Sequence, residues 1–369
     1  MLHSRTQLID ASGIRKVFDL AADLRDPINL SIGQPDFDVP EPVKQAAMEA
    51  IRAGHNRYTV TQGITELREA VRDHLNETRR TSYDTSNILI TSGVSGGLLL
   101  AFLSLFGPGD EVIIPDPYFV MYKHLLRILG ATPVFADTYP DFRFTAERIE
   151  PLISEKTKAI VIGSPSNPTG VVVSETEWKE IVSLVAKKNL LLISDEIYDA
   201  FVYDGSFHSP AALHENVLLL GGFSKSHAMT GWRIGFAAGD KDLINAMTTF
   251  QQFTFVCAPS MVQHAALEAL KTKIGRYREA YRRKRDLLLT ALSPYYEIVG
   301  AEGAFYLFPK APGGDATSFC TRAISEKQLL IIPGSVFSER DTHFRISYAA
   351  DETVLERGIE ALIALAPRA

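Results

Sequence analysis

Short, continuous runs of apolar residues recur through the middle of the chain, and each has the length of a strand buried on both faces. These runs occupy residues 88–90, 111–114, 159–162, 190–193 and 217–220. Segments with helical periodicity separate them, at residues 94–106, 119–129 and 175–188. The last segment opens with Ser174 and Glu177, which have the spacing of a capping box. This alternation predicts an α/β domain with a mostly parallel central sheet flanked by helices.

The two ends of the chain follow other patterns. Toward the N-terminus we expect an arm or short helix over residues 1 to about 25, a strand within 28–37, and helices at 43–53 and 65–77. Toward the C-terminus we expect helices within 260–292, 316–326 and 351–364, and strands at 297–299, 305–308, 329–332 and 344–347. The predicted domains are an arm with part of the small domain (1–40), a large domain (41–275) and a smaller α+β domain (276–369).

The composition is that of an ordinary globular protein, because 46% of the 369 residues are apolar and 22% are charged. A net charge of −6 argues against a nucleic-acid partner, and the basic residues within 276–285 have the spacing of a solvated helix face. Cys257 and Cys320 lack the spacing of a disulfide framework or zinc site, so we expect no metal. The N-terminus lacks a signal-peptide core, and the longest apolar run, 98–106, is too short to span a bilayer. We therefore expect a cytoplasmic protein without a membrane partner.

Polar residues gather where the predicted strands end, which is where ligands bind on such sheets. Residues 91–97 read Thr-Ser-Gly-Val-Ser-Gly-Gly and run into a helix, a pattern that suits an anion such as phosphate or simply a tight turn. Residues 164–170 read Ser-Pro-Ser-Asn-Pro-Thr-Gly, in which two prolines hold the amide of Asn167 in one direction. A proline-rich turn without a ligand would look similar.

Two further strand ends carry ionisable groups. Asp195 ends an apolar strand, where a carboxylate is costly unless it meets a cation or several donors, and Tyr198 follows it. Lys225 lies between an apolar run and a glycine-rich turn, where burial can hold an amine neutral and nucleophilic, and Arg233 follows. Taken alone, Asp195 reads as a helix cap and Lys225 as a surface lysine. Together these strand ends supply the groups that bind pyridoxal 5′-phosphate. Its aldehyde requires an amine and its ring nitrogen an acid, while its phenolic oxygen requires hydrogen-bond donors and its phosphate an anion site.

The order and spacing of these motifs resemble the class I/II aminotransferases of the fold-type I pyridoxal-phosphate superfamily. The resemblance rests on Ser-Pro-x-Asn-Pro-Thr-Gly (164–170), Asp-Glu-x-Tyr (195–198) and Ser-Lys-x-x-x-Met-Thr-Gly-Trp-Arg-x-Gly (224–235). The stretches 31–37, 58–63, 303–308 and 344–348 are also similar to that family, so the resemblance covers the chain from Ser12 to Ser347. It implies fold type I and ping-pong transfer of an amino group from an L-amino acid (aspartate, aromatic or alanine-like) to a 2-oxo acid.

The resemblance also implies the residues that perform the chemistry. Lys225 matches the lysine that holds the cofactor as an internal aldimine, a Schiff base, and then acts as general acid and base. Asp195 would face the pyridine nitrogen and keep it protonated. Asn167 and Tyr198 would donate hydrogen bonds to the phenolic oxygen.

The remaining cofactor contacts follow from the same resemblance. Gly93, Val94 and Ser95 match the turn that cradles the phosphate, and Ser224 and Arg233 would complete it.

Other positions match family residues that contact the cofactor ring, the neighbouring subunit or the substrate. Phe119 would stack on the ring, and Tyr58 would reach the phosphate of the neighbouring subunit, which implies a homodimer with shared active sites. Arg345 would bind the substrate α-carboxylate, with support from Gly33 and Asn167.

The substrate side chain stays open on the sequence. Arg15 and Lys16 are candidates by elimination for a distal carboxylate, while Ile14, Phe119 and Tyr306 suit an apolar pocket. Aspartate, aromatic, alanine-like and branched-chain amino acids remain possible. A C–S β-lyase of the same fold is the main alternative activity. A pyridoxal-phosphate-binding regulator would need an additional basic helix-turn-helix segment, and the sequence does not show one. A dinucleotide-dependent dehydrogenase would need a GxGxxG motif after the first strand, and that motif is not found there.

Overall fold

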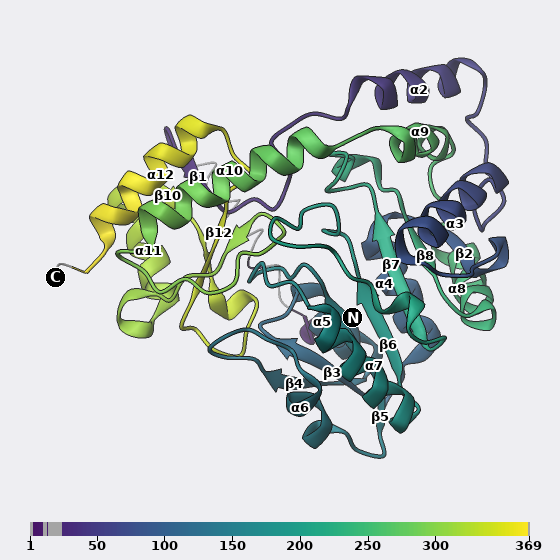
Figure 1. Ribbon diagram of the computed structural model, residues 1–369, viewed down its shortest axis with the longest axis horizontal. Coiled ribbons are helices and arrows are strands. Elements are labelled where there is room, and N and C mark those ends of the chain that lie inside the picture. Colours follow the sequence, from purple (N-terminus) through teal and green to yellow (C-terminus); the bar gives the residue numbers. More distant parts are fainter. Residues whose placement is uncertain (1–2, 10–12, 14–23, 368–369) are drawn as a thin grey trace.

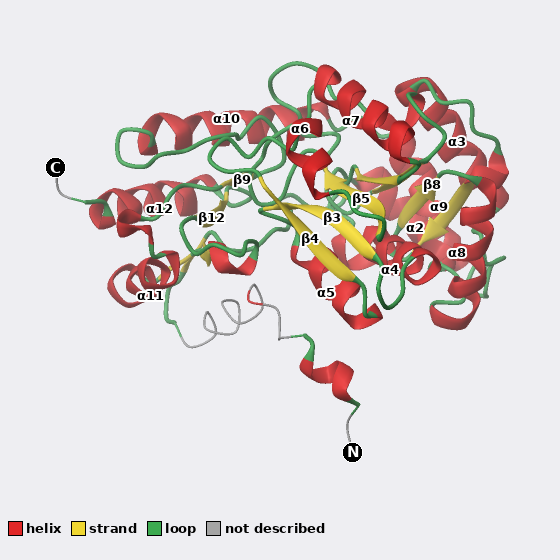
Figure 2. Cartoon of the chain, turned by 90° about the horizontal axis from the view of Figure 1, so that it is seen from below, coloured by secondary structure: helices red, strands yellow, loops and turns green. Residues whose placement is uncertain are grey.

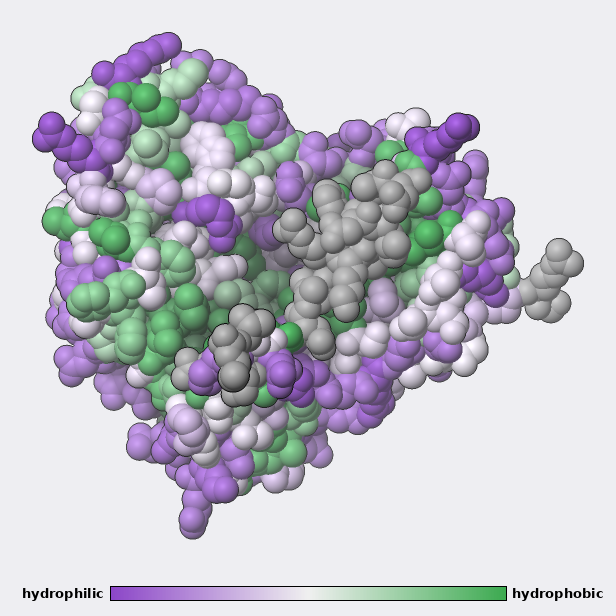
Figure 3. Space-filling model, turned by 180° about the vertical axis from the view of Figure 1, so that it is seen from behind, coloured by the Kyte–Doolittle hydropathy of each residue, from purple (hydrophilic) through white to green (hydrophobic). Residues whose placement is uncertain are grey.

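The computed structural model describes residues 3–9, 13 and 24–367. The expected N-terminal arm lies largely outside these ranges, although a short 3-10 helix, η1 (Ser4–Gln7), is described. Figure 1 shows a larger lobe that contains the central sheet and a smaller lobe around helices α10 to α12. Figure 3 shows both lobes from behind, with apolar side chains gathered on the larger one. Within the described ranges, no helix has the length and apolar character needed to cross a bilayer.

The larger lobe is built on a seven-stranded sheet with the order β2-β8-β7-β6-β5-β3-β4. Its strands are β2 (Ile88–Thr91), β3 (Glu111–Asp116), β4 (Thr132–Asp137), β5 (Thr157–Gly163), β6 (Leu191–Asp195), β7 (Val217–Gly222) and β8 (Gly235–Ala238). Strand β8 runs antiparallel to its neighbours β2 and β7, and the other pairs are parallel. The prediction of a mostly parallel sheet is therefore confirmed, although β4 and β8 were not expected.

Helices cover both faces of this sheet. They are α2 (Glu41–Arg52), α3 (Thr65–Arg79), α4 (Gly93–Leu105), α5 (Val120–Leu129), α6 (Ala146–Ile149), α7 (Glu175–Lys188), α8 (Lys241–Thr254) and α9 (Ser260–Lys271). In β5, Ile160 belongs to the same core as Trp178 of α7, whereas its neighbour Val161 belongs to the core of Leu98 in α4. Figure 2 shows α4 and α5 on one side of the sheet and α6 and α7 on the other. The continuous apolar runs arise because alternate side chains enter two different cores.

The smaller lobe has its own core and two small sheets. Its elements are β1 (Ile28–Asn29), α10 (Gly275–Leu292), β9 (Tyr306–Leu307), α11 (Ala316–Lys327), β10 (Leu329–Leu330), β11 (Ile332–Pro333), β12 (Phe344–Ser347) and α12 (Glu352–Leu365). Strand β1 pairs with β10, which brings the N-terminal segment to the C-terminal part of the chain. The strand expected at 297–299 is wrong, because these residues form a loop. The domain boundaries near 40 and 275 stay predictions.

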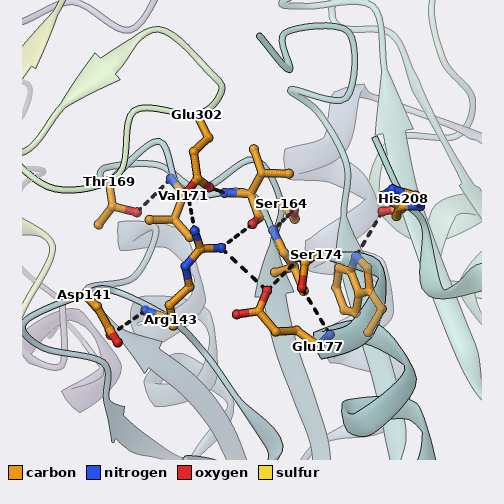
Figure 4. Close-up of polar contacts among 12 residues, drawn as sticks. Asp141, Arg143, Ser164, Thr169, Val171, Ser174, Glu177, His208 and Glu302 are labelled. Atoms are coloured by element: carbon orange, nitrogen blue, oxygen red, sulfur yellow. Dashed lines mark hydrogen bonds and ion pairs between the residues drawn. The ribbon is translucent and has the colours of Figure 1, made fainter. Parts of the chain in front are cut away.

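Arg143 and Glu302 join the two lobes (Figure 4). The Arg143 guanidinium donates to the carbonyl of Val172 at 2.8 Å and also contacts the Glu302 carboxylate. The other oxygen of Glu302 accepts from the Val172 N–H at 2.8 Å. Next to it, the Gly303 N–H donates to the Gly170 carbonyl at 2.8 Å. These bonds tie the segment that leads into β9 to the loop that follows β5.

The Glu302→Ala variant is expected to unfold at a lower urea concentration than the native protein. Glu302 is 29% exposed and accepts bonds from two partners. Losing such charge-assisted bonds costs about 1–3 kcal/mol. The matched control is Glu297→Ala, because Glu297 is 57% exposed and forms a surface ion pair with Lys310, and such pairs contribute about 0–1 kcal/mol. Equal shifts of the unfolding midpoint in the two variants would contradict the inference that Glu302 stabilises the contact between the two lobes.

Candidate active site

A cavity of about 260 Å³ opens at the carboxyl ends of the central strands. The predicted site residues that line it are Gly33, Val94, Ser95, Phe119, Asn167, Asp195, Tyr198, Ser224, Lys225, Arg233 and Arg345. They come from both lobes, since Arg345 lies on β12 and Asp195 on β6. The structure thus brings together residues that are far apart in the sequence.

One end of the cavity is suited to an anion. Gly93 begins helix α4 with φ of +69°, and a Cβ there would lie 2.8 Å from Nη2 of Arg233. Arg233 is held by bonds to the carbonyls of Thr230 (2.9 Å) and Ser92 (3.4 Å). The first N–H groups of a helix have no partner inside it, so the start of α4 and the guanidinium both offer donors. Val94, Ser95 and Ser224 line the same cavity, and Ser224 is buried.

Lys225 follows strand β7, and its Nζ donates to the carbonyl of Gly33 at 2.7 Å. Burial, with the nearby charges of Arg345 and Arg233, lowers the pKa of Lys225 to about 8, although Asp195 opposes this shift. An amine with this pKa is neutral far more often near neutral pH than an ordinary lysine. It is therefore available as a nucleophile or a base.

Asp195 is buried at the end of β6. Its Oδ2 accepts from the hydroxyl of Tyr122 at 3.0 Å, and its Oδ1 accepts from the Ile197 N–H at 3.3 Å. Burial raises the pKa of Asp195 to about 6. Tyr122 was missed from the sequence, because it lies on the apolar side of helix α5 and reads as a core residue.

Arg345 is 1% exposed, which is unusual for an arginine. Nη1 donates to Oδ1 of Asn167 at 3.0 Å and Nη2 donates to the Ser31 carbonyl at 2.7 Å. The guanidinium carbon lies 4.6 Å from the ring centres of both Tyr306 and Phe337. Its Nε is buried without a hydrogen-bond partner among the described residues. A buried cation that keeps an unused donor is suited to bind an anion such as a carboxylate.

Aromatic side chains form much of the remaining wall. The hydroxyls of Tyr198 and Tyr306 lie 2.7 Å apart, and both residues line the cavity. Phe119 and its neighbour Tyr118 also line it.

Other predicted site residues are not brought to the cavity. Tyr58 does not line it and is 83% exposed in this chain. Ile14, Arg15 and Lys16, the candidates for the side-chain pocket, lie outside the described residues. No group of His, Cys, Asp or Glu side chains in the described ranges could hold a metal.

The chain matches the family model described as aminotransferase class I and II over residues 25–362. It is 40% identical to a putative aminotransferase, YugH, of Bacillus subtilis, over 98% of this chain and 96% of that protein. It is 36% identical to a probable aspartate aminotransferase of Methanocaldococcus jannaschii, over 97% and 98% of the two chains. The solved aspartate aminotransferase of Thermus thermophilus with maleate superposes with a TM-score of 0.95 at 35% identity, covering 99% of each chain. The architecture is that of fold type I.

Members of this family use pyridoxal 5′-phosphate. The cavity fits this cofactor on three counts. Gly93 leaves the space that a side chain would fill beside Arg233, Asp195 is a buried carboxylate, and Lys225 is an amine with a lowered pKa. The chain therefore belongs to the class I and II aminotransferases, and its cofactor is pyridoxal 5′-phosphate.

Proposed function

We propose that this protein moves an amino group from an L-amino acid of the aspartate, aromatic or alanine-like type to a 2-oxo acid in a ping-pong reaction. The observation that carries the proposal is the convergence of Lys225, Asp195 and Arg345 on one cavity. Relatives that are named aspartate and aromatic-amino-acid aminotransferases support the first two substrate types. When bound, the cofactor supplies an aldehyde that bonds to amines and a ring that accepts electrons from the substrate Cα.

Lys225 has two tasks in this proposal. Its Nζ would hold the cofactor covalently in the resting protein. Once a substrate amine has replaced it, the free Nζ would take the proton from the substrate Cα and hold it for return. A pKa of about 8 suits both directions of transfer, because the neutral and protonated amines are both populated near neutral pH.

Asp195, Asn167 and Tyr198 adjust the electronic state of the ring. The Asp195 carboxylate would face the ring nitrogen of the bound cofactor and favour its protonated form. Oδ1 of Asn167 is already bound by Arg345, so its Nδ2 is free to donate to the phenolic oxygen. The Tyr198 hydroxyl, held by Tyr306, is the second donor to that oxygen.

The phosphate and the substrate occupy opposite ends of the proposed site. The turn at Gly93, Val94 and Ser95 binds the phosphate together with Ser224 and Arg233.

Arg345 binds the substrate α-carboxylate through its fork of donors. Gly33 and Asn167, which also line the cavity, would support that carboxylate, and Phe119 would stack on the ring of the bound cofactor. The polar contacts at the two ends orient the Cα–H bond toward Lys225, and the aromatic walls exclude water.

A second copy of the chain completes the site in this proposal. Tyr58, Val60 and Phe253 are 83%, 60% and 84% exposed. The loop that carries Tyr58 and Val60 is bonded to α8, because Gln251 of α8 donates to the carbonyl of Thr61 at 2.6 Å. Large apolar side chains that are this exposed on neighbouring segments suit a subunit interface. We therefore place Tyr58 at the phosphate site of the partner subunit.

A half-reaction tests the activity directly. The protein loaded with pyridoxal 5′-phosphate is mixed with single L-amino acids, without an oxo acid, and its absorption spectrum is recorded. We expect conversion to the aminated cofactor with release of the matching 2-oxo acid.

The Lys225→Ala variant should lack the pH-dependent visible band of the native protein. Release of ammonia and pyruvate from cystathionine without an acceptor would favour the β-lyase alternative instead.

Replacing Arg345 with leucine should raise KM for every amino-acid substrate at least about 100-fold. Two charge-assisted bonds to the carboxylate are lost, each of about 1.5–3 kcal/mol, and 1.4 kcal/mol corresponds to tenfold. The control is Arg340→Leu, since Arg340 pairs with Asp137 at the surface and does not line the cavity. A rise in KM confined to one class of amino acids would make Arg345 a side-chain selector.

Mixing two inactive variants tests the shared site. Tyr58→Ala and Lys225→Ala subunits are unfolded together and refolded, so that hybrid dimers form. Each hybrid has one site with both native residues, so activity should exceed that of either parent variant. A monomer in sedimentation, or no recovery in verified hybrids, would contradict the proposed position of Tyr58.

A further inference from the structure

We propose that Tyr122 is a positioning residue whose hydroxyl fixes the orientation of the Asp195 carboxylate in the cofactor cavity, and that Gly163 provides the space for this contact. The inference rests on the function proposed above for Asp195. It concerns a side chain that touches the carboxylate and not the reacting atoms.

The two oxygens of Asp195 have donors from different parts of the fold. The Tyr122 hydroxyl of helix α5 donates to Oδ2 at 3.0 Å, and the Ile197 N–H beyond β6 donates to Oδ1 at the longer distance of 3.3 Å. The terminal torsion of an aspartate is soft, so one long bond leaves the carboxylate free to turn. The bond from Tyr122 removes that freedom and sets the direction in which the carboxylate faces the cavity.

Gly163 is the residue that admits the hydroxyl. It ends β5 and is the direct partner of Asp195 on the neighbouring strand. A Cβ at this position would lie 3.0 Å from the Tyr122 hydroxyl and 4.0 Å from the Cβ of Asp195. That first distance is tighter than most real Cβ contacts, so a side chain at residue 163 would force the Tyr122 hydroxyl to shift and would disturb its bond to the carboxylate.

The charge of Asp195 depends on the same contact. Burial raises the pKa of Asp195 to about 6, and the bond from Tyr122 is the strongest influence that opposes this rise. Burial also raises the pKa of Tyr122 well above its usual value, so the phenol keeps its proton and always donates. Without the phenol, a larger share of Asp195 would be neutral near neutral pH and would present no charge to a ring nitrogen.

The first test is the Tyr122→Phe variant, which removes one oxygen atom. We expect its dissociation constant for pyridoxal 5′-phosphate to rise at least about tenfold, because a hydrogen bond to a charged group is lost, and tenfold corresponds to about 1.4 kcal/mol. We also expect kcat to fall while KM for amino acids changes less than twofold, since Arg345 is untouched. The control is Tyr296→Phe, whose buried hydroxyl donates to the Leu362 carbonyl at 2.6 Å, away from the cavity. It should leave cofactor affinity unchanged.

The second test combines Tyr122→Phe with Gly163→Ala. Alone, Gly163→Ala should weaken cofactor binding about as much as Tyr122→Phe, because its methyl group displaces the hydroxyl. In the Tyr122→Phe background that methyl group has no hydroxyl to displace, so the further loss should be less than threefold. Fully additive losses would show that the two residues act separately and would overturn the proposal.

The proposal and the function on which it rests fail in different ways. Native cofactor affinity and native kcat in Tyr122→Phe would refute the positioning by Tyr122 and leave the transamination assay intact. An Asp195→Asn variant with native affinity and native kcat would instead remove the proposed function of Asp195 itself.

Discussion

An excess of positive charge in the cavity is the constraint on which the site depends. Among the described residues that line the cavity, Lys225, Arg233 and Arg345 are cationic and Asp195 is the single carboxylate. In a medium that screens charges poorly these cations repel one another, and the repulsion contributes to the lowered pKa of Lys225. A phosphate and a substrate carboxylate would relieve it. The same imbalance therefore favours both anionic ligands and a reactive amine.

The fold could be predicted where burial on two faces left a direct mark on the sequence. The apolar runs located β2, β3, β5, β6 and β7 because their side chains enter the cores on both sides. Strand β4 left no such run because most of its residues are partly exposed, and β8 is a strand of four residues, Gly-Phe-Ala-Ala, in which Phe236 is the one large side chain. The loop at 297–299 has an apolar pattern without a strand partner in the structure.

The candidate site could be predicted where a polar group ends an apolar strand, as Asp195 does, or where a motif resembles a known family, as around Lys225. Tyr122 could not, because an aromatic residue on a helix face gives the same pattern whether or not its hydroxyl meets a carboxylate. The function proposed for Tyr58 requires a second subunit, which a single chain does not contain. The functions of these residues stay proposals, whereas the family and the cofactor are established.

The pairing of the N-terminal segment with the last strands affects how the protein is made. Strand β1 pairs with β10, and the Ser31 carbonyl accepts from Arg345 across 314 residues of chain. During synthesis, residues 28–33 emerge long before their partners do. Their partners are not available until almost the whole chain has left the ribosome. Contacts between residues so far apart in the sequence also form slowly. These contacts can therefore form only after nearly the whole chain has been made, and a chain that ends before Arg345 would lack the guanidinium that is bonded to the Ser31 carbonyl.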